Sequence, residues 1–436
     1  MEDIIGTLQN SAFTHAVALD MKSWFNQFAL TNAMRQFMCV KRHQTWWAPT
    51  RLPMGMRHSC LIAQRAIDAL AGNARLIPGV KILTYIDNVL IVGSKENVRS
   101  ALKIFLRDSD AANCTINDID TLKDLANGVS TIPSSVEYCG IILDLVAHTA
   151  KVRDKTLRKM EMLWQERHSW TFRLASGFCS SALFSTRVLA IPKDTLFHQL
   201  NAWRKKAKTI TENHWDEPCV FDENEMSSFD QWRSTILKTN QLGSHHHQSV
   251  FPVSGALMTD ACASDWAGIW WPSSEGGHCH TACGKATCKS KHSSVTEPWA
   301  VFHAAVKLIP AGHQTRTINV FSDNEAFCKA ANKGLSRSWH MNKVIGNLRE
   351  RFPSTKFRFV HIDGHANLAD PLSREKNIEI SDSQRWIDWI SAKSDIDNGF
   401  SQSGVLPHEF RIVWEFESIV YQISAPPASF HRYLIP

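Results

Sequence analysis

The stretch HIDGHANLADPLSR at residues 361–374 decides how the C-terminal part of this chain folds. It begins at the end of an apolar, strand-like segment, passes through a polar loop and enters a short helix that carries Asp370. Three further acids, Asp260, Glu297 and Asp323, stand beside strand-like or helical segments earlier in the chain. Such a quartet is typical of a site for two divalent cations, because hard carboxylate oxygens suit Mg²⁺. The sequence therefore predicts a metal-dependent site in this part of the chain.

The segments around these acids alternate between strand and helix patterns. The predicted order is strands at 256–258, 268–271 and 278–283, a helix at 295–308, a strand at 317–321, a helix at 324–333, a strand at 357–362 and a final helix entered at Asn367. Three strands, a helix and a strand, followed by helix, strand and helix, predict an α/β domain with a mixed five-stranded sheet.

Together with the four acids, residues 361–374 resemble the end of RNase H domains in gypsy-type and tyrosine-recombinase (DIRS/VIPER-like) retrotransposons. The resemblance implies an RNase H-like fold that hydrolyses the RNA strand of RNA–DNA hybrids. Asp260, Glu297, Asp323 and Asp370 would hold two Mg²⁺ or Mn²⁺ ions. His365 stands on the loop where many RNase H domains carry a mobile histidine that assists product release, and an ordinary surface histidine is the open alternative.

A second set of acids lies in the first third of the chain. Residues 13–30 and 80–93 are predicted to form strands, and Asp20 and Asp87 each follow an apolar, β-prone run there, at residues 16–19 and 80–86. A helical pattern covers residues 59–71 between them, and a third extended piece is predicted at residues 136–143. Four segments in order, LDMKSWFNQ (19–27), LPMGMRHSCLIAQ (52–64), YIDN (85–88) and VEYCG (136–140), resemble the palm motifs and the primer grip of retroelement reverse transcriptases. The resemblance implies that Asp20 and Asp87 are metal ligands for nucleotide addition, again with two cations.

The same resemblance assigns roles to neighbouring side chains. Phe25 would exclude a ribose 2′-OH and so favour dNTPs, while Gln64, Tyr85 and the Pro53-Met54-Gly55 turn would contact the nucleotide or template. Two departures predict an impaired polymerase. Asn88 stands where the family usually has a second acid, which lowers the negative charge of the site by one, and only nineteen residues precede Asp20, so that the fingers region expected there is largely missing.

The net charge of +6 is unevenly placed along the 436 residues. Between Lys151 and Lys208 there are 13 Lys and Arg but 4 Asp and Glu, and the spacing there is helical. The segment also contains Trp164, Trp170 and Trp203, and basic residues with interleaved aromatics suit a nucleic-acid backbone. A solvated helical face is the alternative, and both remain open. The candidate phosphate contacts are Arg204, Lys205, Lys206 and Lys208.

Several classes of protein are excluded by composition. No apolar run approaches the ~20 residues of a membrane-spanning helix, and the first residues lack the pattern of a signal peptide. We therefore expect an intracellular protein, in the cytoplasm or nucleus, whose eleven scattered cysteines are reduced. Residues 216–249, which include the triplet His245 to His247, are predicted to be a linker. Zinc is not expected at Cys279, Cys283, Cys288 and His292, because their spacing is not a standard one.

These observations predict an α/β, multidomain fold: a reverse-transcriptase palm at 1–148 with truncated fingers, a basic helical thumb or connection with a linker at 149–245, an RNase H-like domain at 246–380 and an unassigned tail at 381–436. The leading hypothesis is a retroelement RNA-directed DNA polymerase with RNase H activity, whose partners are RNA, DNA, RNA–DNA hybrids and dNTPs. The alternative is a domesticated or decayed copy that serves as a nucleic-acid-binding or assembly scaffold. The sequence leaves the oligomeric state open.

Overall fold

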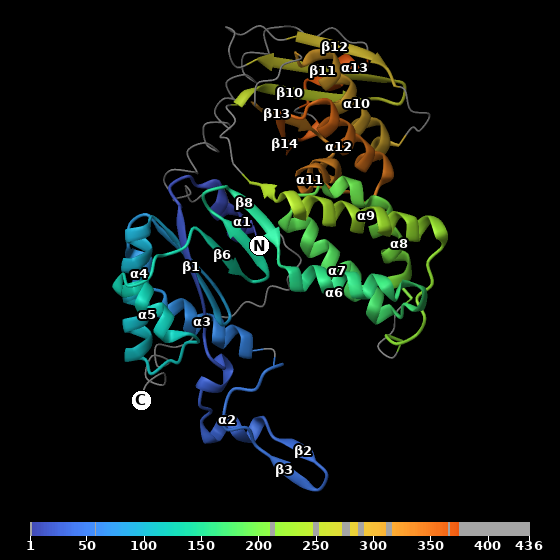
Figure 1. Ribbon diagram of the computed structural model, residues 1–436. Coiled ribbons are helices and arrows are strands. Elements are labelled where there is room, and N and C mark those ends of the chain that lie inside the picture. The colour runs from blue at the N-terminus through green and yellow to red at the C-terminus, as the bar shows by residue number, and fades with distance from the viewer. Residues whose placement is uncertain are drawn as a thin grey trace. The chain divides into compact units, whose positions relative to one another are not determined.

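The computed structural model describes residues 2–56, 58–209, 214–246, 253–272, 280–286, 292–310, 316–364 and 367–374 (Figure 1). The contacts divide the chain into a compact unit, Met1–Asn377, and a second unit, Ile378–Pro436, which lies outside the described residues. His365, His247, Cys279 and Cys288 also lie outside them. Among the described residues, no helix is both long enough and apolar enough to cross a bilayer.

A three-stranded antiparallel sheet in the order β1-β5-β4 lies in the region predicted to be the palm, and we call it the palm sheet. Its strands are β1 (His15–Asp20), β4 (Val80–Tyr85) and β5 (Asn88–Gly93). Alternate side chains of a strand point to opposite faces, and both faces are covered here. Val17 and Leu19 belong to a core shared with the palm helices, whereas Ala16 and Leu90 belong to a core shared with the next sheet and the helical segment. Burial on both faces explains why the strand sequences are nearly all apolar.

The palm helices and short elements surround this sheet. They are α1 (Glu2–Gly6), η1 (Thr7–Gln9), η2 (Trp24–Gln27), α2 (Asn32–Phe37), β2 (Val40–Arg42), β3 (Thr45–Trp47), α3 (Ser59–Leu70), η3 (Ala74–Leu76), α4 (Lys95–Ala111) and α5 (Ile119–Asn127). The predicted helix at 59–71 is confirmed by α3. The predicted strand run at 13–30 is too long, because the chain turns at Ser23, whose φ is 47°, and then buries Trp24.

A four-stranded antiparallel sheet in the order β6-β7-β8-β9 follows the palm, with β6 (Ser135–Tyr138), β7 (Ile141–Asp144), β8 (Thr149–Val152) and β9 (Ser244–His245). Residues 136–143 were predicted to be one extended piece but form a hairpin. The chain reverses at Cys139 and Gly140, whose φ values are 50° and 79°. Glycine adopts this left-handed conformation without a steric penalty. The hairpin places Tyr138 under the palm sheet, where its hydroxyl reaches the backbone of Leu83.

The basic segment is helical, as predicted, and comprises α6 (Asp154–Gln165), η4 (Arg167–Ser169), α7 (Phe172–Val188), η5 (Lys193–Leu196) and α8 (Phe197–Ala207). Its tryptophans correct the sequence interpretation. Trp164 and Trp170 are buried in an aromatic core with Phe178 and Phe229, and Trp203 is half-buried against the same core. Because the rings of Trp164 and Trp170 pack inside this core, they do not offer stacking surfaces to nucleic acid.

The predicted linker at 216–249 is also wrong, because most of it is the 20-residue helix α9 (Glu223–Leu242). A capping box starts this helix: Asp222 accepts from the Glu225 backbone and Glu225 accepts from the Asp222 backbone. Phe229, Trp232 and Ile236 then repeat at helical spacing and are buried. After α9 the chain pairs with β8, and the buried His246 bonds through Nε2 to the Val188 carbonyl at 2.9 Å.

The C-terminal domain has the predicted mixed sheet of five strands, in the order β12-β11-β10-β13-β14. The elements are β10 (Val253–Ala261), β11 (Asp265–Pro272), β12 (His280–Lys285), α10 (Ser293–Leu308), β13 (Arg316–Ser322), α11 (Glu325–Lys333), α12 (Trp339–Arg351), β14 (Thr355–His361) and α13 (Ala369–Ser373). The sequence analysis omitted α12. The first three strands pair antiparallel, and β10, β13 and β14 pair parallel, so the sheet is mixed as predicted.

Candidate active sites

Parallel pairing brings the acids of the C-terminal domain to one edge of its sheet. Asp260 lies near the end of β10, and Asp323 directly follows β13, which runs parallel beside β10. The carboxyl ends of parallel strands meet at the same sheet edge. Glu297 lies in α10, which packs on the sheet, and Asp370 begins α13, which packs against β10 and β11. The four predicted ligands are thus brought to one region from four separate elements.

Side chains from the loop before α13 hold Asp260 in place. Asn367 donates through Nδ2 to Asp260 Oδ1 and to the Thr259 carbonyl, both at 3.1 Å, and Ser373 donates through Oγ to Asp260 Oδ2 at 2.5 Å. Asp370 accepts from Arg374, whose Nε lies 2.9 Å from Oδ1. The sequence analysis quoted the run that contains Asn367, Ser373 and Arg374 but gave them no role. The sequence could have indicated these roles, because all three residues have hydrogen-bonding side chains and lie within about one helical turn of Asp370.

Burial and mutual repulsion perturb these carboxyl groups. Burial raises the pKa of Glu297 to about 7, and the nearby Asp323 and Asp260 add to the shift. Burial likewise raises the pKa of Asp260 and of Asp323, with Asp370 contributing repulsion to both. Each cause disfavours the ionised form. Perturbed carboxyl groups that act on one another are characteristic of functional sites, although structural networks produce them as well.

One atom, Asp323 Oδ1, indicates whether the site suits a divalent cation. Asp323 Oδ1 is buried and has no hydrogen-bond partner among the residues that the structure describes. A buried, unpartnered carboxylate oxygen is costly unless a ligand or cation satisfies it. Across the part of the chain that is described, no three His, Cys, Asp or Glu side chains are grouped closely enough to hold a metal. The four acids therefore interact electrostatically without forming a closed coordination cage. Their donor chemistry suits Mg²⁺ or Mn²⁺, which accept carboxylate oxygens.

The palm acids meet at the end of the three-stranded sheet. Asp20 ends β1, and Asp87 lies in the two-residue turn between β4 and β5, where the Met21 amide donates to the Asp87 carbonyl at 2.8 Å. Burial raises the pKa of Asp20, and the charges of Asp87 and Asp118 raise it further. Asn88 donates through Nδ2 to Asp87 Oδ1 at 2.9 Å. The Asn88 amide thus binds the neighbouring carboxylate, whereas an acid at this position would repel it.

Two residues beside Asp20 had no role in the sequence analysis. Asn117 donates to Asp20 twice, from its backbone to the carbonyl at 2.9 Å and from Nδ2 to Oδ2 at 2.6 Å. Asp118 follows with φ 51° and immediately precedes α5. Both line a cavity of about 180 Å³ together with Asp20, Asn88 and residues of β1, α5 and β6. No motif marks Asn117 and Asp118, because only the folded chain brings them beside β1.

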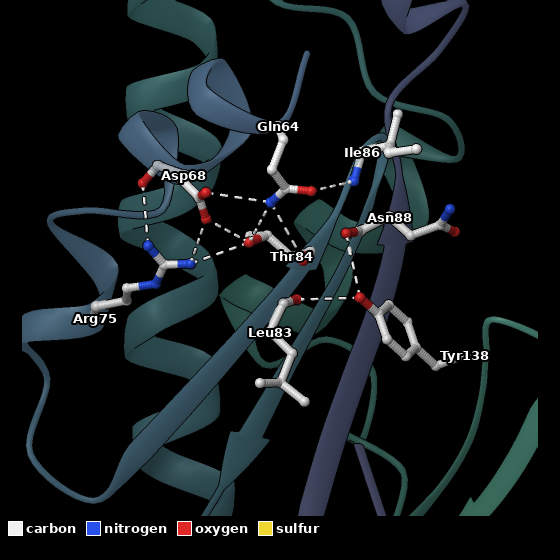
Figure 2. A network of polar contacts seen from close by, with 8 residues as sticks. All are labelled: Gln64, Asp68, Arg75, Leu83, Thr84, Ile86, Asn88 and Tyr138. Carbon is white, nitrogen blue, oxygen red and sulfur yellow. Dashed lines mark hydrogen bonds and ion pairs between the residues drawn. The ribbon is translucent and has the colours of Figure 1, made fainter. Parts of the chain in front are cut away.

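Figure 2 shows a polar network that reaches Ile86, the residue before Asp87 in the turn between β4 and β5. Gln64 on α3 accepts from the Ile86 amide through Oε1 at 2.8 Å, and its Nε2 donates to Asp68 and Thr84. Arg75 closes the network with an ion pair to Asp68 at 2.8 Å. Ile86 has φ 58°, a left-handed conformation that is strained for a β-branched residue. Gln64 was predicted to contact nucleotide or template, and the structure places its amide in this internal network.

The other predicted substrate contacts occupy the palm surface. Phe25 is half-buried in η2 and packs against the palm core, while Tyr85 is 59% exposed at the end of β4. The Pro53-Met54-Gly55 turn precedes α3, with Gly55 at φ 90°, and Ser59 Oγ donates to the Pro53 carbonyl at 2.7 Å. These positions leave their assigned roles as predictions.

The basic candidates lie at the end of α8. Lys205 and Lys208 are exposed, and Lys206 lies over the Phe221 ring, 5.8 Å from its centroid. Arg204 is half-buried, and burial together with the nearby charge of Arg337 lowers its pKa. The exposed lysines are therefore the ones best placed to meet a phosphate backbone.

Comparison with known proteins gave structural likenesses alone. No protein-family model matches the chain, and no curated protein matches it. Foamy viral protease-reverse transcriptase is similar in two solved complexes, a dRH form with double-stranded DNA (13% identity, TM-score 0.43) and one with an RNA/DNA hybrid (14% identity, TM-score 0.43). The matches cover 82% and 86% of this chain but 59% and 46% of the foamy viral chains. A further complex with double-stranded DNA matches at 14% identity and TM-score 0.41, covering 82% of this chain and 70% of the other.

Proposed function

We propose that this chain is a retroelement RNA-directed DNA polymerase with RNase H activity, and that its C-terminal domain cleaves the RNA strand of RNA–DNA hybrids. One observation carries the proposal. Among the described residues, Asp323 Oδ1 is buried and unpartnered at the sheet edge that Asp260 shares, beside Glu297 of α10 and Asp370 of α13. A structural acid would gain a hydrogen bond or an ion pair there, whereas a metal ligand keeps an oxygen available.

The residues of this site have separable roles in the proposed reaction. Paired divalent cations, when bound, would activate a water and stabilise the charge that develops on the scissile phosphate. Asn367 and Ser373 orient the Asp260 carboxylate, and Arg374 fixes that of Asp370. Glu297, with its pKa near 7, would lose its proton as a cation enters, because positive charge favours the ionised carboxylate.

Cleavage of a labelled RNA–DNA hybrid in Mg²⁺ by full-length Asp323→Asn tests this proposal. We expect the rate to fall by on the order of a hundredfold or more, because a charge at the reacting centre is lost, while affinity for the hybrid changes by less than about twofold. Glu325→Gln is the matched control, since Glu325 lies two residues away, is exposed and pairs with Lys329. Undiminished cleavage by Asp323→Asn, or equal losses in both variants, would contradict the site.

The polymerase half of the proposal depends on Asp20 and Asp87, which the palm sheet brings together. We propose that it uses dNTPs, and that the element belongs to the gypsy-type or tyrosine-recombinase group, acting in the cytoplasm or nucleus. Primer extension on poly(rA) by the wild-type chain and by Asn88→Asp tests the polymerase. Extension that is weak in the wild type and rises in Asn88→Asp would support an impaired but intact centre. Hybrid binding with neither extension nor cleavage would instead support the scaffold alternative.

A further inference from the structure

The segment of residues 31–49, which contains α2, β2 and β3, presents aromatic rings to solvent. Every residue of β2 and β3 is exposed, and α2 has no buried residue. Phe37 is 90% exposed, Trp46 66% and Trp47 63%. Figure 1 shows the hairpin of β2 and β3 extending from α2 away from the palm sheet. Large exposed apolar side chains that cluster in this way mark an interaction surface.

The base of this hairpin is fixed, so its position on the palm is defined. The Leu30 amide donates to the Thr50 carbonyl at 3.1 Å and the Leu52 amide donates to the Phe28 carbonyl at 3.0 Å. Beyond these bonds, β2 and β3 pair at three positions, and none of their residues is buried. A two-stranded hairpin of this kind is only marginally stable in water, and a partner that stacks on its rings would stabilise it.

The charge of this segment and its neighbours indicates what kind of partner the exposed rings would bind. Residues 21–67 contain no Asp or Glu and seven Lys and Arg. The sequence analysis assigned the positive field to residues 151–208 and missed this acid-free stretch. A long positively charged stretch without acids favours a polyanion, and it opposes pairing with the same surface of a second copy, because like charges would then meet.

The cross-strand register puts a ring and a cation on each face of the hairpin. Lys41 is paired with Trp46, and the Lys41 ammonium lies 5.8 Å from the Trp46 ring centroid. Val40 is paired with Trp47 on the opposite face, which it shares with Arg42, because side chains two apart on a strand share a face. Each face therefore offers a flat indole for a base and a cation for a phosphate.

We propose that the β2–β3 hairpin is a binding platform for single-stranded nucleic acid, on which bases stack on Trp46 and Trp47. Exposed bases of a single strand present π-faces for stacking, whereas the bases of a duplex are covered by their neighbours. The inference rests on the proposed function only in taking nucleic acid as the partner, and it requires neither catalytic site to be active.

Binding of a fluorescent oligo(dT) to the full-length protein tests the platform. We expect the Trp46→Ala/Trp47→Ala variant to bind at least about 30-fold more weakly, because two stacked bases are lost, and the Trp46→Phe/Trp47→Phe variant to keep most of the affinity, because a phenyl ring still stacks. In Lys41→Ala/Arg42→Ala, the slope of the logarithm of oligo(dT) affinity against the logarithm of salt concentration should be smaller in magnitude by about 1.4, because two phosphate contacts are lost. Trp339→Ala, which removes an exposed tryptophan of α12, is the control and should bind as the wild type does.

The outcomes separate this inference from the proposed function. Cleavage of the hybrid is measured on the same variants, and unchanged cleavage with weakened oligo(dT) binding supports the platform. Affinity within about twofold of wild type in the double alanine variant would overturn it, whatever the cleavage assay gives. It is also overturned if sedimentation shows a dimer that the alanine variant abolishes while oligo(dT) binding persists, since the surface would then bind a second copy.

Discussion

Gln64→Met tests whether the network of Figure 2 holds the turn that carries Asp87. Methionine keeps the length of the side chain but removes the acceptor of the Ile86 amide, which Gln64 Oε1 meets at 2.8 Å. Leaving a partly buried backbone N–H without a partner costs about 1–3 kcal/mol. Ile86 is strained as well, since a left-handed conformation costs an L-residue roughly 1–2 kcal/mol. Without its hydrogen bond, the turn would release this strain energy if Ile86 moved to another conformation.

Hydrogen exchange followed by mass spectrometry on a peptide that spans β4 and β5 measures this change locally. A loss of about 1–3 kcal/mol corresponds to exchange of the Ile86 amide that is about 5- to 150-fold faster. Gln36→Met on the exposed surface of α2 is the matched control and should leave this peptide unchanged. In an Ile86→Gly background, where the strain is relieved, the effect of Gln64→Met should shrink by about 0.5–2 kcal/mol. Exchange within threefold of wild type in Gln64→Met would refute the argument.

Three further results are expected. Because burial and nearby acids raise the Glu297 pKa from 4.5 to about 7, the metal-free protein should lose stability as the pH rises from about 4.5 through 7. Mg²⁺ should offset this loss at about pH 8, and in Glu297→Gln the melting temperature should depend less on pH over this range. Trp170→Ala should lower the stability of the helical segment by about 3–5 kcal/mol in urea unfolding, since this buried ring contacts Phe178 and Phe229, and a cost below about 1 kcal/mol would mean that the ring is not in the core. Lys205→Ala/Lys208→Ala should reduce the salt dependence of hybrid binding by about two in slope, and an unchanged slope would make this end of α8 a solvated face.

The local signals in the sequence identified the acids and several of the elements around them, although they missed α9 and α12. Apolar, β-prone runs that end at an acid predicted β1 and β4, and the five-stranded mixed sheet followed from the order of strands and helices. These features depend on residues close together in the chain, so a single sequence displays them. The positions of Asp20, Asp87, Asp260 and Asp323 at strand ends were readable for the same reason.

The direction in which a side chain points depended on the tertiary structure. The sequence showed basic residues and tryptophans together at 151–208, but the helical packing buries Trp164 and Trp170 and leaves Trp46 and Trp47 exposed. The polar stretch at 216–249 looked like a linker, because its apolar stripe of Phe229 and its partners is narrow and gains its stability only when packed.

The tertiary structure also determined which residues assist the acids. Asn117 lies 97 positions from Asp20 in the chain and Asn367 lies 107 from Asp260, yet each donates a hydrogen bond to its acid. Contacts at such separations leave no periodicity or motif, since they depend on where whole elements pack. The sequence by itself determined the charged groups that this protein has for chemistry and the strands that carry most of them. The fold decided which of those groups face one another, because burial and pairing are properties of the packed chain.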